Sequence, residues 1–500
     1  MGARLALAVI LAVVFVAPLA GIAMPASGQK TIVVGALLPL TGDLQSYGVR
    51  AKAAIEVAVD DVNKYLEEKN AWFRIKLVTE DTGTKPDIAV QKFNALVAQG
   101  IKFIVGPMTS AEVKKIKDLA TQHNILVISP SSTALELAIP GDNVFRFCPA
   151  DDVQAQAIAK LVEDMGVKAV VLIIRADTWG EGLKDEISKR LKKMGVEIAG
   201  TIEYNPESPN FPAVATEANN FVTSLLGKYK PSEVAVILVA FNEAVGLFKQ
   251  AAKYPNLAKV PWFGSDGTAK LAEIVKDPVS AQFAEKVLFI NPIYSPAATA
   301  KQKEVAEKVK AKIGEEPDAY SYAAHDAIWA IALALLKIGP TSDMNTLVNK
   351  VKELLPQITT SDEFGKEAAT GKFPLNKAGD RATADYDMWL VYTVGGKTDW
   401  LKVGTYLGNE NKFRWYSVMD GKTFPEVYKE TFGGAAIKTT TTPTTSSPSP
   451  TVATPASPAS TSPSPTSPAA AGGQTALAVG IAIVVIVIII AAVLALRRRR

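Results

Sequence analysis

Short apolar runs alternate with amphipathic segments along most of this chain, and that alternation leaves few folds open to it. The runs at 31–38, 169–174 and 234–239 are rich in Val, Ile and Leu, which is typical of strands buried on both faces. Segments such as 49–66 place Ala and Val at helical spacing on one face. Strict alternation of this kind predicts an α/β protein with parallel sheets covered by helices. The series occurs once before about residue 147 and again after it, so we expect two doubly wound lobes.

The expected folded region, residues 29–437, is nearly neutral and too long for a single core. Of the 54 Lys and Arg residues in the chain, six lie outside this region, whereas all 50 acidic residues lie within it, which leaves a net charge of about −2. This balance offers no electrostatic footprint for nucleic acid or for an anionic membrane surface. We therefore expect no nucleic acid among the partners.

The chain holds one cysteine, Cys148, and two histidines, His123 and His325. A single cysteine excludes an intramolecular disulfide, and we interpret Cys148 as a small buried hydrophobe because it follows the strand-like run 145–147. Neither histidine has a second His or Cys at ligand spacing, so we expect no metal site and no cofactor. The sequence also lacks a nucleophile elbow and a phosphate-binding glycine loop, so we expect a binding protein without catalytic residues.

Both ends of the chain carry segments typical of export and membrane anchoring. Residues 1–28 combine a basic start, an apolar core and small residues, which predicts a secretory signal peptide; an uncleaved N-terminal anchor is the alternative. Residues 433–473 form a Ser/Thr/Pro-rich linker that cannot bury enough apolar surface to fold. Residues 474–496 carry no charge and are long enough for a transmembrane helix. The four arginines at 497–500 favour a cytoplasmic tail, so we expect a single-pass protein of the cell membrane with an extracellular folded domain.

Four loops at the ends of predicted strands are rich in small and hydroxyl residues. In open parallel sheets, ligands bind beyond the carboxyl ends of the strands, and free N–H groups at helix starts favour an anion there. Helix capping is the structural alternative for each loop, as in the capping-box pattern of Thr109 and Glu112. We expect the loops to meet at one cleft; they are residues 40–48, 106–110, 129–133 and 177–182.

Six motifs occur in an order that points to a known family. They are Gly35-Ala-Leu-Leu-Pro-Leu-Thr-Gly42, Asp81-Thr-Gly-Thr-Lys-Pro86, Val105-Gly-Pro107, Ile128-Ser-Pro-Ser-Ser-Thr133, Trp179-Gly-Glu-Gly182 and Tyr320-Ser-Tyr322-Ala-Ala-His325-Asp326-Ala327. Each motif is loose by itself, but the ordered set is specific. Over about residues 30–430, the chain resembles the leucine/isoleucine/valine-binding (branched-chain amino acid) family of ABC-transporter solute-binding proteins.

The resemblance implies a type I periplasmic-binding fold. In this fold, two Rossmann-like doubly wound lobes are joined by a three-crossover hinge and close on a ligand. We accordingly expect lobe 1 to comprise residues 30–147 and 268–345. We expect lobe 2 to comprise residues 148–267 and 346–432.

Carried over position by position, the same resemblance implies a ligand site between the lobes. Ser110 matches the serine whose hydroxyl and N–H bind the ligand carboxylate, and Thr133 matches the threonine that supports the ligand's polar head. Ser131 matches a position that offers its backbone carbonyl to the ligand ammonium, and Asp266 matches the acidic residue that pairs with this ammonium. The resemblance also implies aromatic or apolar contacts from Tyr47, Trp179 and Phe241.

Two of these residues depart from the family pattern. Asp266 stands where the family usually has glutamate, so its carboxylate reaches less far. Trp179 stands where the family usually has tyrosine, and its bulkier indole cannot accept a hydrogen bond. Either change could move the ligand from a branched-chain amino acid to another amino acid, an amide or a small carboxylate. The structural alternatives are a turn residue before Gly267 for Asp266 and a surface-packing aromatic for Trp179.

These implications give the expected function. We expect an extracytoplasmic solute-binding protein that captures an amino acid by closing two lobes and delivers it to ABC permease subunits in the membrane. A ligand-sensing ectodomain of a surface receptor complex is the alternative, as is a receptor for amides or small carboxylates. Because the sequence ends four residues after the predicted span, we expect no signalling domain in the same chain.

Overall fold

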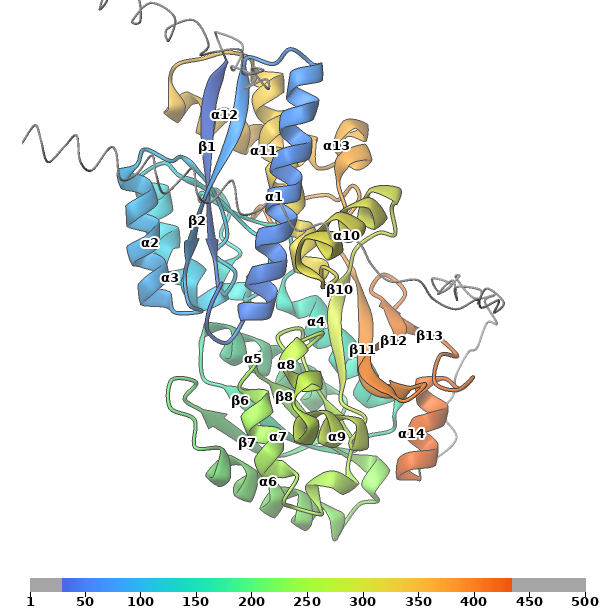
Figure 1. The fold of residues 1–500 in the computed structure, drawn as a ribbon. Helices are drawn as coiled ribbons and strands as arrows, with labels where there is room; N and C mark the ends of the chain where they lie inside the picture. The colour runs from blue at the N-terminus through green and yellow to red at the C-terminus, as the bar shows by residue number, and fades with distance from the viewer. Residues whose placement is uncertain (1–28, 434–500) are drawn as a thin grey trace, which may run out of the picture. The chain divides into compact units, whose positions relative to one another are not determined.

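Two β-sheets organise the folded region, which a computed structural model describes for residues 29–433 (Figure 1). The first sheet is entirely parallel, with the order β2-β1-β3-β4-β5. Its strands are β1 (Lys30–Leu38), β2 (Phe73–Asp81), β3 (Phe103–Val105), β4 (Leu126–Ser129) and β5 (Val144–Arg146). The predicted signal peptide, transmembrane helix and arginine tail, and nearly all of the predicted linker, lie outside the described residues.

The second sheet has eight strands in the order β13-β12-β11-β10-β9-β8-β6-β7. Its part from β7 to β10 is parallel, whereas β11, β12 and β13 continue it as an antiparallel edge that was not expected from the sequence. The parallel strands are β6 (Ala169–Arg175), β7 (Glu197–Tyr204), β8 (Val234–Val239), β9 (Trp262–Phe263) and β10 (Ile290–Ser295). The antiparallel strands are β11 (Asp385–Val394), β12 (Lys397–Leu407) and β13 (Lys412–Trp415).

Helices pack around each sheet and complete two lobes (Figure 1). The helices of lobe 1 are α1 (Gln45–Glu68), α2 (Pro86–Ala98), α3 (Ser110–Gln122), α10 (Ala300–Ile313), α11 (Ala319–Ile338), α12 (Met344–Ile358) and α13 (Asp362–Glu367). The helices of lobe 2 are α4 (Asp151–Asp164), α5 (Thr178–Lys193), α6 (Phe211–Leu226), α7 (Ala244–Ala251), α8 (Ala272–Lys276), α9 (Pro278–Lys286) and α14 (Phe424–Phe432). The two lobes belong to one compact unit, and the α/β architecture expected from the alternation is confirmed.

Local sequence accounts for the elements that carry the cleft. Every residue of β6 is buried, as its run of apolar residues predicts for a central strand. Thr109 and Glu112 form the predicted capping box at the start of α3. Asp177 caps α5 by accepting hydrogen bonds from two backbone N–H groups. These caps fix where the two helices begin, and both helix starts lie at the carboxyl ends of strands.

The chain crosses between the lobes three times, which matches the expected hinge. The crossings follow β5, β10 and α13. Arg146 at the end of β5 forms two hydrogen bonds to Asp380 in the third crossing, at 2.6 and 2.7 Å, and both side chains are buried. This bidentate pair ties the first crossing to the third.

Two of the expected lobe boundaries are wrong. β10 pairs with β9 and β11, so the segment from 268 to 295 belongs to lobe 2 rather than lobe 1. Helices α12 and α13 pack on α11, so the segment from 346 to 367 belongs to lobe 1 rather than lobe 2. Sheet membership depends on pairing between strands that are distant in sequence, and local periodicity does not predict that pairing.

The buried helix α11 is the centre of lobe 1. Among residues 29–433 it is long and apolar enough to cross a membrane, but 78% of the qualifying window is buried inside the fold. His325 lies in this helix with its Nδ1 2.8 Å from a carboxylate oxygen of Asp326. Cys148, in the first crossing, is 1% exposed, as expected of a small buried hydrophobe, and burial raises the pKa of its thiol.

Candidate ligand-binding site

A cavity lies between the lobes, at the carboxyl ends of the parallel strands. The space between its lining atoms is about 350 Å³, and part of it opens to solvent. Lobe 1 contributes the residues around the starts of α1, α3 and α11 and a residue that follows β4, and lobe 2 contributes those that follow β6, β8 and β9. The lining residues are Leu44, Tyr47, Met108, Thr109, Ser110, Ser131, Trp179, Phe241, Asp266, Gly267 and Tyr320.

Six of the seven residues expected to contact a ligand line this cavity. Thr133 is the exception: it is buried and is not among the residues that line the cavity. Its backbone N–H donates to the Ser110 hydroxyl oxygen at 3.1 Å, so its backbone helps to hold Ser110 in place. The six that line the cavity are Tyr47, Ser110, Ser131, Trp179, Phe241 and Asp266.

Ser110, the first residue of α3, is held by the loop that follows β4. Its Oγ accepts hydrogen bonds from the backbone N–H groups of Thr133 and Ala134, each at 3.1 Å. A hydroxyl that accepts two such bonds has its own proton left to donate. The backbone N–H of Ser110 is one of the first N–H groups of the helix, which have no partner within it. These two donors and the helix start make a small anion-binding nest.

The loop from 129 to 134 is fixed by hydrogen bonds within lobe 1. Ser131 Oγ donates to the backbone carbonyl of Met108 at 2.7 Å. Arg146 donates to the carbonyls of Ser132 and Ala134, at 3.1 and 2.8 Å. The Ser131 carbonyl accepts none of the hydrogen bonds found between the described residues, so it keeps its acceptor capacity. The same arginine that ties the hinge therefore also holds this wall of the site.

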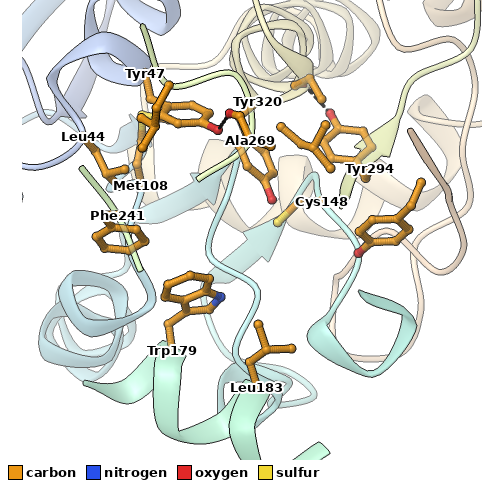
Figure 2. Close-up of a cluster of buried hydrophobic side chains, with 14 of the residues drawn as sticks. Leu44, Tyr47, Met108, Cys148, Trp179, Leu183, Phe241, Ala269, Tyr294 and Tyr320 are labelled. Carbon is orange, nitrogen blue, oxygen red and sulfur yellow. Dashed lines mark hydrogen bonds between the residues drawn. The ribbon is translucent and has the colours of Figure 1, made fainter. Parts of the chain in front are cut away.

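Two stacked aromatic rings form the lobe 2 wall (Figure 2). Trp179 and Phe241 lie with ring centroids 4.8 Å apart and an angle of 14° between the planes. The guanidinium of Arg175 lies 4.2 Å from the centroid of Phe241. Gly267 lets the next loop approach closely, because a Cβ at this position would lie 2.5 Å from the Trp179 ring. Trp179 is 3% exposed, so the alternative of a surface-packing aromatic is excluded.

Asp266 presents a buried carboxylate to the cavity from lobe 2. Its Oδ2 accepts a short hydrogen bond from the Tyr320 hydroxyl, which comes from lobe 1. Its Oδ1 is buried and accepts no hydrogen bond from the described residues. Burial raises the pKa of this carboxyl to about 6, against the opposing effect of the Tyr320 hydroxyl. A buried carboxylate with one free oxygen is suited to bind a cation such as an ammonium.

A second buried acid, Asp151 at the start of α4, is linked to Asp266 through Gln154. The Gln154 amide donates to Asp151 Oδ1 at 3.0 Å and accepts from the backbone N–H of Asp266 at 2.9 Å. Burial, together with the charge of Asp266, raises the pKa of Asp151. Each carboxyl group therefore opposes the ionisation of the other. Gln154 fixes their relative positions by bonding to both residues.

Several side chains of lobe 1 bind the loop of lobe 2 that carries Asp266. The Tyr47 hydroxyl donates to the backbone carbonyl of Asp266 at 2.9 Å and also to that of Ala269 (Figure 2). Arg50 donates to the carbonyl of Lys270 at 3.0 Å. These contacts bring the two lobes together on either side of the cavity.

An ion pair also joins the lobes at the edge of the site. Asp43, in the loop before α1, lies 3.1 Å from Arg175 at the end of β6. Within lobe 2, Arg175 also pairs with Asp177 at 2.6 Å and with Glu243 at 2.7 Å. The arginine is thus neutralised by its own lobe, and Asp43 adds a partner from the other.

Sequence reasoning missed five of the lining residues as individual positions. Tyr320 belongs to one of the six ordered motifs, but that motif indicated the family and not a ligand contact. Its place in the first turn of α11, just after the cap Asp318, is the signal that could have identified it, since the other helix starts were chosen on that ground. The other four are Leu44, Met108, Thr109 and Gly267. Within residues 29–433, no group of three or more His, Cys, Asp or Glu side chains could hold a metal ion.

Comparisons with known proteins agree with this architecture. Residues 31–397 match the family model described as periplasmic binding protein. An uncharacterised protein of Methanocaldococcus jannaschii is 33% identical over 399 residues, covering 78% of this chain and 93% of the relative. A Leu/Ile/Val-binding protein of Rhizobium johnstonii is 25% identical over 376 residues, covering 74% of this chain and 94% of the relative.

A solved structure shares the fold. It is the branched-chain amino acid transporter substrate-binding protein of Streptococcus pneumoniae in complex with isoleucine, which is 22% identical with a TM-score of 0.59. The similarity covers 75% of this chain and all of the other. The matched family and these functionally named relatives are described as binding proteins rather than enzymes.

Proposed function

The chain belongs to the periplasmic binding protein family, and from that premise we propose that it is the receptor of an ABC importer for a hydrophobic α-amino acid. One observation carries the proposal. The cavity between the two lobes has a hydroxyl and N–H nest on one side and a buried carboxylate with a free oxygen on the other. A zwitterion has the two charges that match these two sides.

The polar groups of the cavity suit the two ends of an amino acid. Ser110 would donate to the ligand carboxylate from its hydroxyl and its backbone N–H. Asp266 would pair with the ammonium through Oδ1, and the Ser131 carbonyl would accept a further ammonium proton. None of the lining residues is Lys, Arg or His, so an acid with several negative charges would lack a cationic partner in the cavity.

The remaining walls favour an apolar ligand side chain. Leu44 and Met108 lie on the lobe 1 side of the cavity, and Trp179 and Phe241 on the lobe 2 side (Figure 2). Burying an aliphatic side chain against such walls contributes about 1.5–3 kcal/mol. The hydroxyl groups of Tyr47 and Tyr320 are engaged in hydrogen bonds. Their rings remain available for contact and add further surface for an apolar side chain. This combination supports a branched-chain or related amino acid.

Ligand capture would proceed by closure of the lobes. The carboxylate partner Ser110 lies on lobe 1 and the charged ammonium partner Asp266 on lobe 2, so only the closed form offers both to one ligand. A ligand shifts an equilibrium between two conformations by as much as its affinities for them differ. The hydrogen bonds from Tyr47 and Arg50 across the cleft are further contacts that exist only when the lobes meet.

We further propose that the receptor works outside the cell while attached to its membrane. The sequence supports this through the export signal at 1–28 and the apolar segment 474–496, both of which lie outside the described residues. An anchored receptor stays at a raised effective concentration near its permease. Deletion of residues 474–500 should release the protein from the membrane fraction into the medium, which immunoblotting of the two fractions would measure.

A simple carboxylate is the second candidate ligand. The raised pKa of Asp266, about 6, lets this carboxyl be protonated in mildly acidic solution, where it could donate to a ligand oxygen instead of binding an ammonium. An amide could use the same donor. These ligands would bind best at low pH, whereas an amino acid would bind best above pH 6.

A thermal-shift screen separates these candidates. The protein would be heated with amino acids, their amides and the matching carboxylates at about pH 7.5. A ligand at 100 times its dissociation constant should stabilise the fold by about 2.7 kcal/mol. A response to leucine, isoleucine or valine but not to 4-methylpentanoate supports the amino-acid receptor. A response only to carboxylates, strengthening at low pH, would replace it with the second candidate.

A further inference from the structure

Tyr320 contacts the ligand cavity and Asp266 at the same time. It lies in the first turn of α11 in lobe 1, lines the cavity and is 5% exposed. Its hydroxyl donates to Oδ2 of Asp266, which belongs to lobe 2. The bond therefore runs across the cleft and ends on the group that the proposed function assigns to the ligand ammonium.

The two oxygens of Asp266 have different surroundings. Oδ2 is engaged by the phenol, while Oδ1 is buried and accepts no hydrogen bond from any residue between 29 and 433. The backbone of the same residue is held by Gln154 at its N–H and by Tyr47 at its carbonyl. The phenol thus holds Oδ2 from the opposite lobe, and this contact leaves Oδ1 for a ligand.

Neighbouring rings hold Tyr320 in place (Figure 2). The ring of Tyr47 lies 6.1 Å away at 46°, and the ring of Tyr294 lies 5.5 Å away at 47°. The Tyr294 hydroxyl in turn donates to the backbone carbonyl of Ala319 at 2.6 Å, next to Tyr320 in sequence. A side chain packed on two sides and tied through its backbone presents its hydroxyl at a defined place.

The other ionisable groups around Asp266 do not compensate its charge. They are Asp151 on α4, Cys148 in the first crossing, Tyr47 on α1 and Tyr386 on β11, and each is neutral or negative. Burial raises the pKa of Asp266, and the Tyr320 hydroxyl opposes that rise. Because a hydrogen bond donated to an ionised group stabilises the ionised form, this phenol acts on the protonation state as well as on the orientation.

We propose that Tyr320 is a positioning residue of the ligand site, which keeps Asp266 ionised and aims its free oxygen at the ligand ammonium. The proposal deepens the proposed function and rests on it for the identity of the ligand group. It makes recognition depend on closure, because the phenol and the carboxylate belong to different lobes. A residue that merely braced the lobes would lack the effect on the protonation of Asp266.

The ligand-free test is the pH dependence of thermal unfolding in Tyr320→Phe, which removes one oxygen atom. At pH 4.5 Asp266 is mostly protonated in both proteins, and the variant loses only a bond between neutral groups. As the pH rises through about 6, the wild type gains a bond to an ionised carboxylate that the variant cannot make. The difference in Tm between the two proteins should therefore at least double between pH 4.5 and 7.5.

Two controls isolate this effect. Tyr322→Phe removes a hydroxyl two residues along the same helix, on a side chain that packs against Ala53 and Val57 and contacts no part of the cavity. The difference in Tm between Tyr322→Phe and the wild type should not change with pH. In the Asp266→Asn background, Tyr320→Phe should likewise lower the Tm by the same amount at every pH. A constant difference in the wild-type background would overturn the proposal, as would an equal pH dependence in the Asn background.

Folding failure is also informative. If Tyr320→Phe does not fold at pH 7.5, the proposal requires that it fold at pH 4.5, where the carboxyl is protonated. Failure at both pH values would assign Tyr320 a purely structural role and overturn the proposal. Far-UV circular dichroism at the two pH values decides between these outcomes.

The ligand-binding test uses L-leucine and isothermal titration at pH 7.5. Loss of a hydrogen bond to a charged group should weaken binding at least about tenfold in Tyr320→Phe, with no change in Tyr322→Phe. Equal affinity in both variants would overturn the proposal. If the wild type itself binds no amino acid, the proposed function fails, while the ligand-free pH experiment still decides whether Tyr320 controls Asp266.

Discussion

The two lobes present opposite kinds of surface to the same cavity. On the lobe 1 side, the two serine hydroxyl groups are already held within the lobe: Ser110 Oγ accepts from two backbone N–H groups, and Ser131 Oγ donates to a carbonyl. On the lobe 2 side, Asp266 keeps one buried oxygen without a partner beside a stack of two aromatic rings. One wall is preformed, and the other contains an uncompensated acid.

This difference indicates how the free energy of binding is divided. A nest of oriented N–H and hydroxyl groups needs little rearrangement to receive a carboxylate, so its contribution resembles that of ordinary hydrogen bonds. A buried carboxylate without a cation is costly, so an ammonium that pairs with it relieves that cost as well as forming a bond. We therefore expect the lobe 2 side to dominate affinity and the lobe 1 side to contribute less.

Removing the charge of lobe 2 should have the largest effect. Asp266→Asn keeps the shape of the side chain but leaves the ligand ammonium buried without a counter-charge, which costs about 3–5 kcal/mol. The affinity for L-leucine should fall by more than about a hundredfold at pH 7.5, as isothermal titration would measure.

Two analogues of leucine show whether the loss follows the ammonium. In 4-methylpentanoate the amine is missing, and in 3-methylbutylamine the carboxylate is missing. Asp266→Asn should abolish binding of the amine and leave binding of the carboxylate unchanged or improved. Equal weakening of both analogues would contradict the division between the two walls.

Protonating the same carboxyl should have the next largest effect. Binding of an ammonium requires ionised Asp266, whose pKa is raised by burial to about 6 in the ligand-free protein. Affinity for leucine should be constant above about pH 7 and fall about tenfold per pH unit below 6, or about thirtyfold by pH 4.5. The same group makes the ligand-free protein less stable as the pH rises from about 4 to 6, because its ionised form is disfavoured when buried.

The pH prediction is checked by titrating leucine at intervals from pH 4.5 to 8. Asp266→Asn should give a flat profile, since the titrating group is gone. A wild-type affinity that rises towards low pH would mean that the protonated acid is the binding form. That result would favour the simple carboxylate as ligand.

The residues of the lobe 1 wall could be predicted from local sequence patterns more easily than those of the lobe 2 wall. The lobe 1 nest consists of short segments at helix starts, and the capping box of Thr109 and Glu112 confirms the predicted start of α3. Asp266 was assigned through family resemblance, because one acid in a turn looks like any other turn residue. Its partners Gln154 and Tyr320 lie 112 and 54 residues away, so no local pattern could reveal that they meet.

Errors in the expected architecture have the same origin. The strand β10 was assigned to lobe 1 although it pairs with β9 and β11 in lobe 2. Sequence patterns indicate which residues form a strand or loop, whereas pairing and side-chain direction depend on the assembled fold.

Disrupting the lobe 1 nest should have a smaller effect on affinity. Ser110→Ala removes the hydroxyl donor to the ligand carboxylate but leaves the backbone N–H, so leucine binding should weaken about tenfold. It also leaves the N–H groups of Thr133 and Ala134 without an acceptor, which should lower the free energy of unfolding by about 1–3 kcal/mol. Isothermal titration and urea unfolding measure the two effects.

Ser131→Ala is the matched control for the nest. It removes a hydroxyl from the same wall that donates to the Met108 carbonyl and not to the ligand. It should change stability by less and leave the affinity for 4-methylpentanoate nearly unchanged, whereas Ser110→Ala should weaken binding of that carboxylate. If Ser110→Ala weakened leucine binding as strongly as Asp266→Asn, the two walls would contribute equally and the contrast would be wrong.

The smallest effect is expected where the two walls meet directly, at the ion pair of Asp43 and Arg175. Arg175 is almost fully buried and keeps Asp177 and Glu243 as partners, whereas the Asp43 side chain is 38% exposed. Exposed ion pairs contribute about 0.2–1 kcal/mol and weaken with salt. Asp43→Asn should therefore weaken leucine binding about two- to fivefold at low ionic strength, through faster dissociation from a less stable closed form.

Salt provides the control for this pair. At about 1 M salt, where charges are screened beyond about 3 Å, the wild type and Asp43→Asn should bind leucine with nearly equal affinity. Asp87→Asn, which removes the partner of Lys115 on the exposed surface of lobe 1, should have no effect on binding at either salt concentration. A large, salt-independent loss in Asp43→Asn would show that closure depends on this contact more than on the ligand. In that case the free energy of binding would not be divided between the two cavity walls alone, because contacts outside the cavity would hold the lobes together.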